Sequence, residues 1–176
     1  SSLETPRLLL RPFEAGDVAA YAAIRSKPEV IRFLPGGVER ARHANDVASQ
    51  IVTDFAMPWR ERAGYAPWAV ITKSDGLLRG HLGLRVLAEE GGRTELLYML
   101  DSAVWGHGLA TEGALATRDF AFDQLHLRHI IAMALPENTA SMRVMVKIGM
   151  VREPGLVKAF GLDVVRFNLA APLDMA

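Results

Sequence analysis

The chain has 176 residues, of which 50% are hydrophobic and 23% charged, and 20 Lys and Arg residues balance 20 Asp and Glu residues. These values are typical of one globular domain over residues 1–176, long enough to bury a core without metal or disulfide staples. The zero net charge argues against a basic face for nucleic acid, and the absence of cysteine excludes disulfides, thiolate zinc sites and a cysteine nucleophile.

The first part of the chain combines one strand pattern with two helix patterns. Residues 7–13 read as a strand, and Asp17 is a suitable N-cap for an Ala-rich helix that runs to about Ser26. Apolar residues recur at four-residue spacing between 47 and 55, which predicts a second helix over residues 39–55. These helices therefore precede most of the strands.

Three strand-like runs follow, each separated from the next by a turn signal. They span residues 68–72, 79–87 and 94–100. Asp75-Gly76 and Gly91-Gly92 lie between them, and such dipeptides favour tight hairpin turns. The three runs therefore predict an antiparallel meander.

The second half of the chain contains a strand–helix–strand unit. The apolar stripe of residues 110–125 predicts a helix, and residues 130–134 form an all-apolar run typical of a strand buried on both faces. Asn138 is a suitable N-cap for the last helix, Gly149 is its C′ residue, and residues 164–169 read as a final strand. We therefore expect an α/β fold, an α+β mixed sheet with a largely antiparallel first half and one central βαβ crossover.

A loop rich in small residues lies between the third meander strand and the next helix: Trp105-Gly106-His107-Gly108-Leu109-Ala110-Thr111-Glu112. Its backbone N–H groups can approach a ligand closely, and the helix N-terminus adds about half a positive charge, so the segment suits an anion. Thr111 stands where a Rossmann fingerprint needs Gly or Ala, and the chain lacks the Gly-Lys-Ser/Thr of a P-loop. The alternative is that the glycines only form a tight turn.

This loop is one of several recognisable motifs. The others are Glu4-Thr5-Pro6-Arg7-Leu8-Leu9-Leu10-Arg11-Pro12, Asp119-Phe120-Ala121-Phe122, Asn138-Thr139-Ala140-Ser141 and Lys147-Ile148-Gly149-Met150. Together with the order of the elements, the set resembles the GNAT acetyltransferase superfamily, in its RimJ/RimL-like branch, over nearly the whole chain. Gly113 departs from the Ala more typical after the Glu, and inside a helix it costs about 0.8–1 kcal/mol relative to Ala.

The resemblance implies an acetyl-CoA site in a notch where the fourth and fifth strands splay apart, with the pyrophosphate on the loop amides. It assigns to acetyl-CoA the residues Met99, Leu100, Trp105, Gly106, His107, Gly108, Leu109, Ala110, Thr111, Asn138 and Ser141. A backbone N–H near Met99 or Leu100 would polarise the acetyl carbonyl, and Tyr98 would line the site. Acetyl-CoA is then a co-substrate, and no metal is expected, because His126 and His129 lack further ligands.

Glu95 and Ser141 are the candidate catalytic residues. Glu95 lies in a Glu-Leu-Leu-Tyr segment that resembles the family's Glu-Ile-Gly-Tyr stretch, and it would act as a general base directly or through water. The alternative is an ordinary salt-bridged strand residue. Ser141 lies where some members of the family protonate the departing CoA thiolate, and its alternative is a simple helix-start residue.

Other polar residues have two readings each. His81 is either a second base or, more commonly for a lone strand histidine, a structural residue, and His107 is expected to face solvent. Arg143 and Lys147 either reach a phosphate or lie on a solvated face. Residues 102–150 carry four basic and four acidic side chains, so we expect phosphate recognition to come mainly from backbone amides and a helix N-terminus.

The motifs favour an acetyl-CoA-dependent N-acetyltransferase that acts on a primary amine, either a protein N-terminal α-amine or a small-molecule amine. At pH 7 an α-amine costs about 1 kcal/mol to deprotonate and a Lys side chain roughly 4.6 kcal/mol, so a base matters far more for Lys. The alternative is a non-catalytic module that binds CoA as a sensor. Residues 57–62 would border the acceptor side, and an exposed strand edge would support a homodimer.

No apolar run approaches the length of a membrane span. The longest, residues 18–24, is far shorter than the ~20 residues that a bilayer requires. Ser1-Ser2-Leu3-Glu4 lacks the layout of a signal peptide, and a leading serine is compatible with processing or cloning. With no cysteine present, we expect a cytoplasmic protein that does not bind a membrane.

Overall fold

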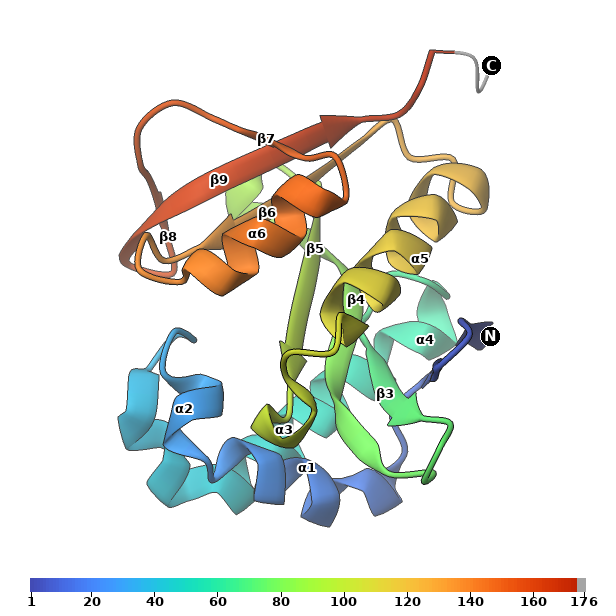
Figure 1. Cartoon of the computed structure of the whole chain (residues 1–176), viewed down its shortest axis with the longest axis vertical. Helices are drawn as coiled ribbons and strands as arrows, with labels where there is room; N and C mark the ends of the chain where they lie inside the picture. The colour runs from blue at the N-terminus through green and yellow to red at the C-terminus, as the bar shows by residue number, and fades with distance from the viewer. Residues whose placement is uncertain (174–176) are drawn as a thin grey trace.

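The computed structural model describes residues 1–173 (Figure 1). Within them the strands form a nine-stranded sheet of order β1-β2-β3-β4-β5-β6-β9-β7, with β8 paired to β9. The strands are β1 Leu3–Glu4, β2 Leu8–Arg11, β3 Trp68–Thr72, β4 Leu78–Leu87, β5 Arg93–Leu100, β6 His129–Ala134, β7 Val151–Arg152, β8 Val157–Ala159 and β9 Leu162–Ala170. The α-helices are α1 Val18–Arg25, α2 Pro28–Ile31, α3 Ala44–Ala56, α4 Pro58–Glu61, α5 Leu109–Asp123 and α6 Thr139–Lys147. The predicted domain extends to residue 176, and its last three residues lie outside this description.

The sheet has the mixed topology that the sequence predicts. β2, β3, β4 and β5 pair antiparallel in succession, and β3 coincides with the predicted run at 68–72. α5 then crosses to β6, which lies parallel to β5, and β6 pairs antiparallel with β9. The antiparallel first half and the single central crossover are therefore confirmed.

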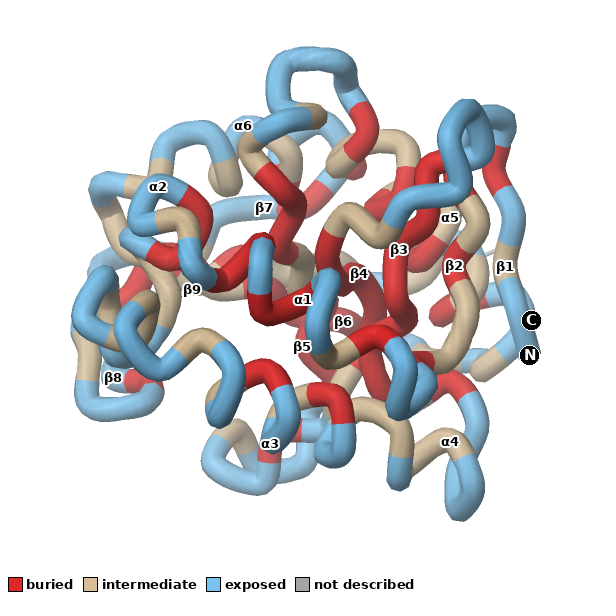
Figure 2. The backbone as a smooth tube through the Cα atoms, turned by 90° about the horizontal axis from the view of Figure 1, so that it is seen from below, coloured by how far each residue is buried: buried red, intermediate tan, exposed pale blue. Residues whose placement is uncertain are grey.

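Helices cover both faces of the sheet. α1, α2 and α3 share one hydrophobic cluster with Met99 of β5, and α5 and α6 share another with β4, β5, β6 and β9. Figure 1 shows α1, α2 and α3 together at one end of β5, and α6 lying against β6 and β9. Figure 2 shows that the buried backbone gathers in the central strands. β5 therefore lies between two helical layers and contacts helices of both.

α5 approaches the sheet closely at Gly113. A Cβ at this position would lie 2.6 Å from Cδ1 of Leu82, a fully buried β4 residue. The sequence suggested only a cost in helix propensity for this glycine. The structure adds a packing reason, because any side chain here would push α5 away from β4.

Asp17 plays a different part from the one predicted. It precedes α1, but its carboxylate makes no capping hydrogen bond to that helix. Instead, it accepts two hydrogen bonds from the Arg11 guanidinium, each 2.8 Å long, and one from the Glu14 N–H. The carboxylate therefore ties the end of β2 to the start of α1.

The predicted helix over residues 39–55 starts later than expected. Residues Gly37–His43 form a 3₁₀ helix, and α3 begins at Ala44. The short helix α2 was not predicted, because four residues are too few to show a helical period. Its omission matters, because α2 forms one wall of the cavity described next.

Candidate functional site

The central feature of the site is the divergence of β5 from β6. β4 and β5 pair over eight register positions, whereas β5 and β6 meet only at Glu95 and Ile131. Beyond that position the two parallel strands separate, so the remainder of β5 has a partner on one side only. The predicted notch between the fourth and fifth long strands is therefore present.

Strand geometry identifies the backbone groups of β5 that face the notch. Asp101 N–H donates to the Arg79 carbonyl at 2.6 Å, which makes this a hydrogen-bonded pair of the β4–β5 ladder. Such pairs alternate along an antiparallel ladder, so Met99 also turns its backbone groups toward β4. Tyr98 and Leu100 then turn their N–H groups toward the notch. Of the two predicted donors to the acetyl carbonyl, Leu100 is the one whose N–H faces the notch.

The loop before α5 supplies a second set of backbone donors. Gly106 and Gly108 have φ angles of +80° and +77°, a left-handed conformation that side chains other than glycine rarely adopt. Gly108 directly precedes α5, a helix of 15 residues. The first N–H groups of such a helix have no partner within it, and in α5 they lie at the end nearer the notch. Trp105 fastens the loop to the strand, because its indole N–H donates to the Leu100 carbonyl at 2.9 Å.

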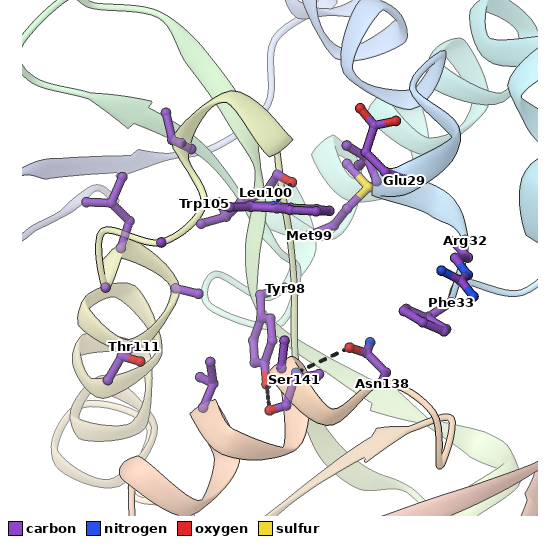
Figure 3. Close-up of a pocket in the computed structure, with 18 of the residues that line it drawn as sticks. Glu29, Arg32, Phe33, Tyr98, Met99, Leu100, Trp105, Thr111, Asn138 and Ser141 are labelled. Atoms are coloured by element: carbon purple, nitrogen blue, oxygen red, sulfur yellow. Dashed lines mark hydrogen bonds between the residues drawn. The ribbon is translucent and has the colours of Figure 1, made fainter.

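A cavity of about 550 Å³ joins the notch to the loop (Figure 3). Ten of the residues predicted to bind acetyl-CoA line it: Met99, Leu100, Trp105, Gly106, Gly108, Leu109, Ala110, Thr111, Asn138 and Ser141. The cavity walls do not include His107, the remaining predicted residue, or Glu95. The His107 carbonyl instead accepts a hydrogen bond of 2.8 Å from Arg7.

Tyr98, Asn138 and Ser141 form a hydrogen-bonded group where β5 meets the start of α6 (Figure 3). The Ser141 hydroxyl donates to Oη of Tyr98 at 3.0 Å, and Tyr98 donates to the Ser141 carbonyl at 2.8 Å. Asn138 caps α6 as predicted, since its side chain accepts from Ser141 N–H at 3.2 Å. Burial raises the pKa of Tyr98 to about 12, so this phenol stays protonated at neutral pH.

Glu95 is buried and does not line the cavity. One of its carboxylate oxygens accepts from Nε of Arg85 at 3.2 Å. Burial raises the pKa of Glu95, while the charge and hydrogen bond of Arg85 act in the opposite direction. Glu95 and Met99 lie on the same face of β5, four residues apart, and Met99 reaches the cavity.

His81 occupies a buried position beneath α1. Its Nδ1 lies 2.7 Å from the Tyr21 hydroxyl, and its ring contacts Phe55 edge-on. Burial, aided by the charges of Arg25 and Arg85, lowers the pKa of His81 to about 3. The imidazole is therefore neutral at pH 7 and belongs to the core, in line with the structural reading of this residue.

Several residues of the cavity wall were not predicted. Glu29, Arg32 and Phe33 come from α2 and the turn after it, opposite the loop in Figure 3. Glu29 is the one carboxylate among the residues that line the cavity, and its Oε1 accepts from the Ser102 hydroxyl at 3.0 Å. Lys147 also lines the cavity. No local pattern in the sequence indicates α2, whereas Lys147 is one of the two residues expected either to reach a phosphate or to lie on a solvated face.

Neither a metal centre nor a membrane span emerges from the described part of the chain. Residues 1–173 contain no cluster of three or more His, Cys, Asp or Glu side chains suited to a metal ion. No helix in that range has both the length and the hydropathy needed to cross a bilayer.

A family model described as an acetyltransferase (GNAT) domain matches residues 7–151. The chain belongs to the GNAT acetyltransferase family. YoaA of Bacillus subtilis, described as an uncharacterized N-acetyltransferase, is 32% identical over 151 residues, which cover 86% of this chain and 83% of YoaA. GNAT members therefore resemble this chain across both the notch and the loop.

Solved structures agree with this assignment. A GNAT-family acetyltransferase from Bacillus anthracis has a TM-score of 0.76 at 27% identity, covering 97% of this chain and 98% of the other. Mycobacterium smegmatis RimJ in complex with CoA-disulfide also has a TM-score of 0.76, at 25% identity, covering 97% of this chain and 86% of RimJ. The chain is thus an N-acetyltransferase of the GNAT kind. Enzymes of this family use acetyl-CoA and act on an amine acceptor.

Proposed function

We propose that this GNAT protein transfers an acetyl group from acetyl-CoA, held in the notch, to a free α-amine such as the N-terminus of a peptide or protein. A small-molecule primary amine is the second candidate acceptor. The observation that carries the proposal is one cavity that runs from the loop amides past Tyr98 and Leu100 to α2. It offers the thioester and the amine a common space.

The acetyl-CoA side of the cavity fits a small anionic ligand without a basic patch. Gly108 lines this part of the cavity and, at a φ of +77°, has a backbone conformation that side chains rarely adopt. The amides at the start of α5 add the positive end of a helix dipole, which favours a pyrophosphate. Lys147 lines the cavity and is one of the side chains that the sequence analysis considers for a phosphate.

The acceptor side favours an amine that loses its proton easily. Glu29 is the one carboxylate on the cavity wall, and its side chain is exposed, so no buried carboxylate stands directly against the amine. An α-amine needs only about 1 kcal/mol for deprotonation at pH 7, against roughly 4.6 kcal/mol for Lys. The same Glu29 carboxylate suits an incoming ammonium group by charge.

The catalytic roles follow from these positions. We assign the general base to Glu95, acting through water, because its carboxylate is buried and does not itself line the cavity. The Leu100 N–H donates to the acetyl oxygen as charge develops there. The attacking nitrogen forms the amide bond as the carbon–sulfur bond breaks, and its surplus proton passes through the water to Glu95. The Ser141 hydroxyl, which bonds to Tyr98 before the reaction, donates its proton to the departing thiolate and takes one from a solvent water in its place.

An acceptor panel tests this function. Purified protein and acetyl-CoA are incubated at pH 7 with three acceptors: a peptide with a free N-terminus and no Lys, the same peptide N-blocked and carrying one Lys, and a small primary amine. We expect CoA release to be fastest with the free N-terminus, by about two orders of magnitude over the Lys peptide, which follows the neutral fraction of each amine. Faster acetylation of the Lys peptide would contradict the α-amine assignment.

A matched pair of glycine variants places the activity in the cavity. Gly108→Trp places a bulky side chain beside Arg7 at a strained φ of +77°, and it is expected to lower turnover more than about ten-fold because it displaces the amides that hold the phosphates. Gly155→Trp introduces the same side chain at a similar φ of +70°, away from the cavity, and is expected to keep activity. Tight CoA binding by the parent protein without turnover of any amine would support the sensor module instead.

A further inference from the structure

Arg7 connects the N-terminal hairpin to the loop that precedes α5. Its Nη1 donates to the His107 carbonyl at 2.8 Å, and its Nε donates to Oε1 of Glu112 at 2.8 Å. Its backbone N–H donates to Oε2 of Glu112 at 3.0 Å. Thr5 completes the group, since its hydroxyl donates to the same oxygen at 2.6 Å. We call Thr5, Arg7 and Glu112 the hairpin clamp.

The clamp fixes the direction of one loop amide. The His107 carbonyl and the Gly108 N–H belong to the same planar trans peptide, and in such a unit the two groups point in opposite directions. Because Arg7 holds the carbonyl on its own side of the loop, the Gly108 N–H must point to the other side. Gly108 lines the cavity, whereas Arg7, His107 and Glu112 do not.

The clamp also neutralises a charge that would oppose an anion. Glu112 lies in the first turn of α5, next to the amides proposed for the phosphates. Burial on its own would raise its pKa, but the hydrogen bonds from Thr5 and Arg7 lower it, so the side chain is ionised at neutral pH. The Arg7 guanidinium at 2.8 Å compensates this negative charge. Without Arg7, the loop would present a carboxylate beside the ligand's phosphates.

We propose that Arg7 and Glu112 are positioning residues for the phosphate end of acetyl-CoA: they orient the Gly108 amide into the cavity and cancel the charge of the first turn of α5. The proposal rests on the proposed function, because it assumes that the loop holds the pyrophosphate. Neither residue touches the reacting thioester. Their effect should therefore appear only with a ligand that carries the phosphates.

Two thioester substrates separate positioning from general structural support. Kinetics are measured with acetyl-CoA and with acetyl-pantetheine, which keeps the thioester and lacks the pyrophosphate. For Arg7→Ala we expect the KM for acetyl-CoA to rise about ten-fold with kcat unchanged, because an oriented amide donor to a charged phosphate is lost. The KM for acetyl-pantetheine should change less than about two-fold, since this substrate makes no contact with the loop amides.

Further variants keep the test decisive. Glu112→Gln retains an oxygen acceptor for Thr5 or Arg7 and should raise the acetyl-CoA KM less than Arg7→Ala does. Glu4→Gln is the matched control, because Glu4 lies on the same hairpin but pairs with Lys73, away from the loop. Equal losses on both thioesters, or none in either clamp variant, would overturn the proposal. A parent protein that fails to bind acetyl-CoA would instead refute the proposed function.

Discussion

Two carboxylates near the cavity differ in burial and in partners, and this difference bears on the choice of base. Glu95 is buried against Arg85, and burial raises its pKa. Glu29 is exposed on the wall and bonded to Ser102. A raised pKa makes a carboxylate a stronger base near neutral pH, whereas exposure gives direct access to the amine. Burial therefore makes Glu95 the stronger base, whereas Glu29 has direct access to the cavity. If Glu95 is the base, a water must carry the proton from the amine to its carboxylate.

The pH dependence of a Glu95 variant decides this point. With a free α-amine as acceptor, Glu95→Gln should lower turnover about 10²-fold at pH 7, where most of the amine is protonated and needs a base. At pH 9 the amine is mostly neutral, so the same variant should lose less than about ten-fold. The measurement is kcat for CoA release at both pH values. Glu29→Gln serves as the comparison.

The outcome separates the two carboxylates. If Glu95→Gln loses activity equally at pH 7 and pH 9, Glu95 is not the base. If Glu29→Gln shows the pH-dependent loss and Glu95→Gln does not, the base is the carboxylate on the cavity wall.

Among the elements, α5 determines both the loop and the packing of the sheet. Its first turn lines the cavity, and its body packs on β4 through Gly113. A helix-interior glycine is unfavourable by about 0.8–1 kcal/mol, so its presence indicates a compensating gain in packing. That gain is the close packing of α5 on Leu82. This packing holds the N-terminus of the helix beside the notch.

Gly113→Ala tests this packing. Helix propensity alone predicts stabilisation by about 1 kcal/mol, whereas a Cβ placed 2.6 Å from Leu82 Cδ1 predicts overpacking that costs about 1–3 kcal/mol. Because Leu82 is fully buried and cannot move away freely, we expect the overpacking cost to match or exceed the propensity gain, for a net destabilisation of about 0–2 kcal/mol by urea unfolding. In a Leu82→Ala background the same change should become neutral or stabilising. Stabilisation of the parent protein by Gly113→Ala would contradict the packing argument.

The sequence predicts the elements whose pattern is local. β3 matched residue for residue, because an apolar run between turn signals marks a buried strand, and Asn138 was recognised as a cap for α6. α2 is not predicted because its four residues show no period. Asp17 is the N-cap residue of α1, as predicted, but no local pattern shows that its carboxylate binds Arg11 instead of the helix N-terminus. Side chains that act through tertiary contacts carry no local signal.

The same limit applies to the site. The loop and α6 positions could be found by motif, and they do line the cavity. The α2 wall and the pairing of Arg7 with Glu112, 105 positions apart, arise only when the sheet brings distant segments together. Sequence reasoning therefore identified residues on the loop and α6 sides of the cavity and missed those on the α2 side.

At the scale of the whole molecule, the topology produces the binding site in a chain with no net charge. One parallel crossover in an otherwise antiparallel sheet lets β5 and β6 separate after a single register position. The gap leaves strand amides unpaired, and α5 directs its N-terminus toward the same space. Positive potential thus comes from oriented backbone dipoles, which composition does not record.

A crystal structure of the protein with bound CoA tests this arrangement most directly. We predict that the pyrophosphate oxygens lie within hydrogen-bond distance of backbone amides from Gly106 to Thr111, and that the sulfur lies beside Ser141 and Tyr98 between β5 and β6. Side-chain cations alone on the phosphates, or CoA bound outside the notch, would contradict it.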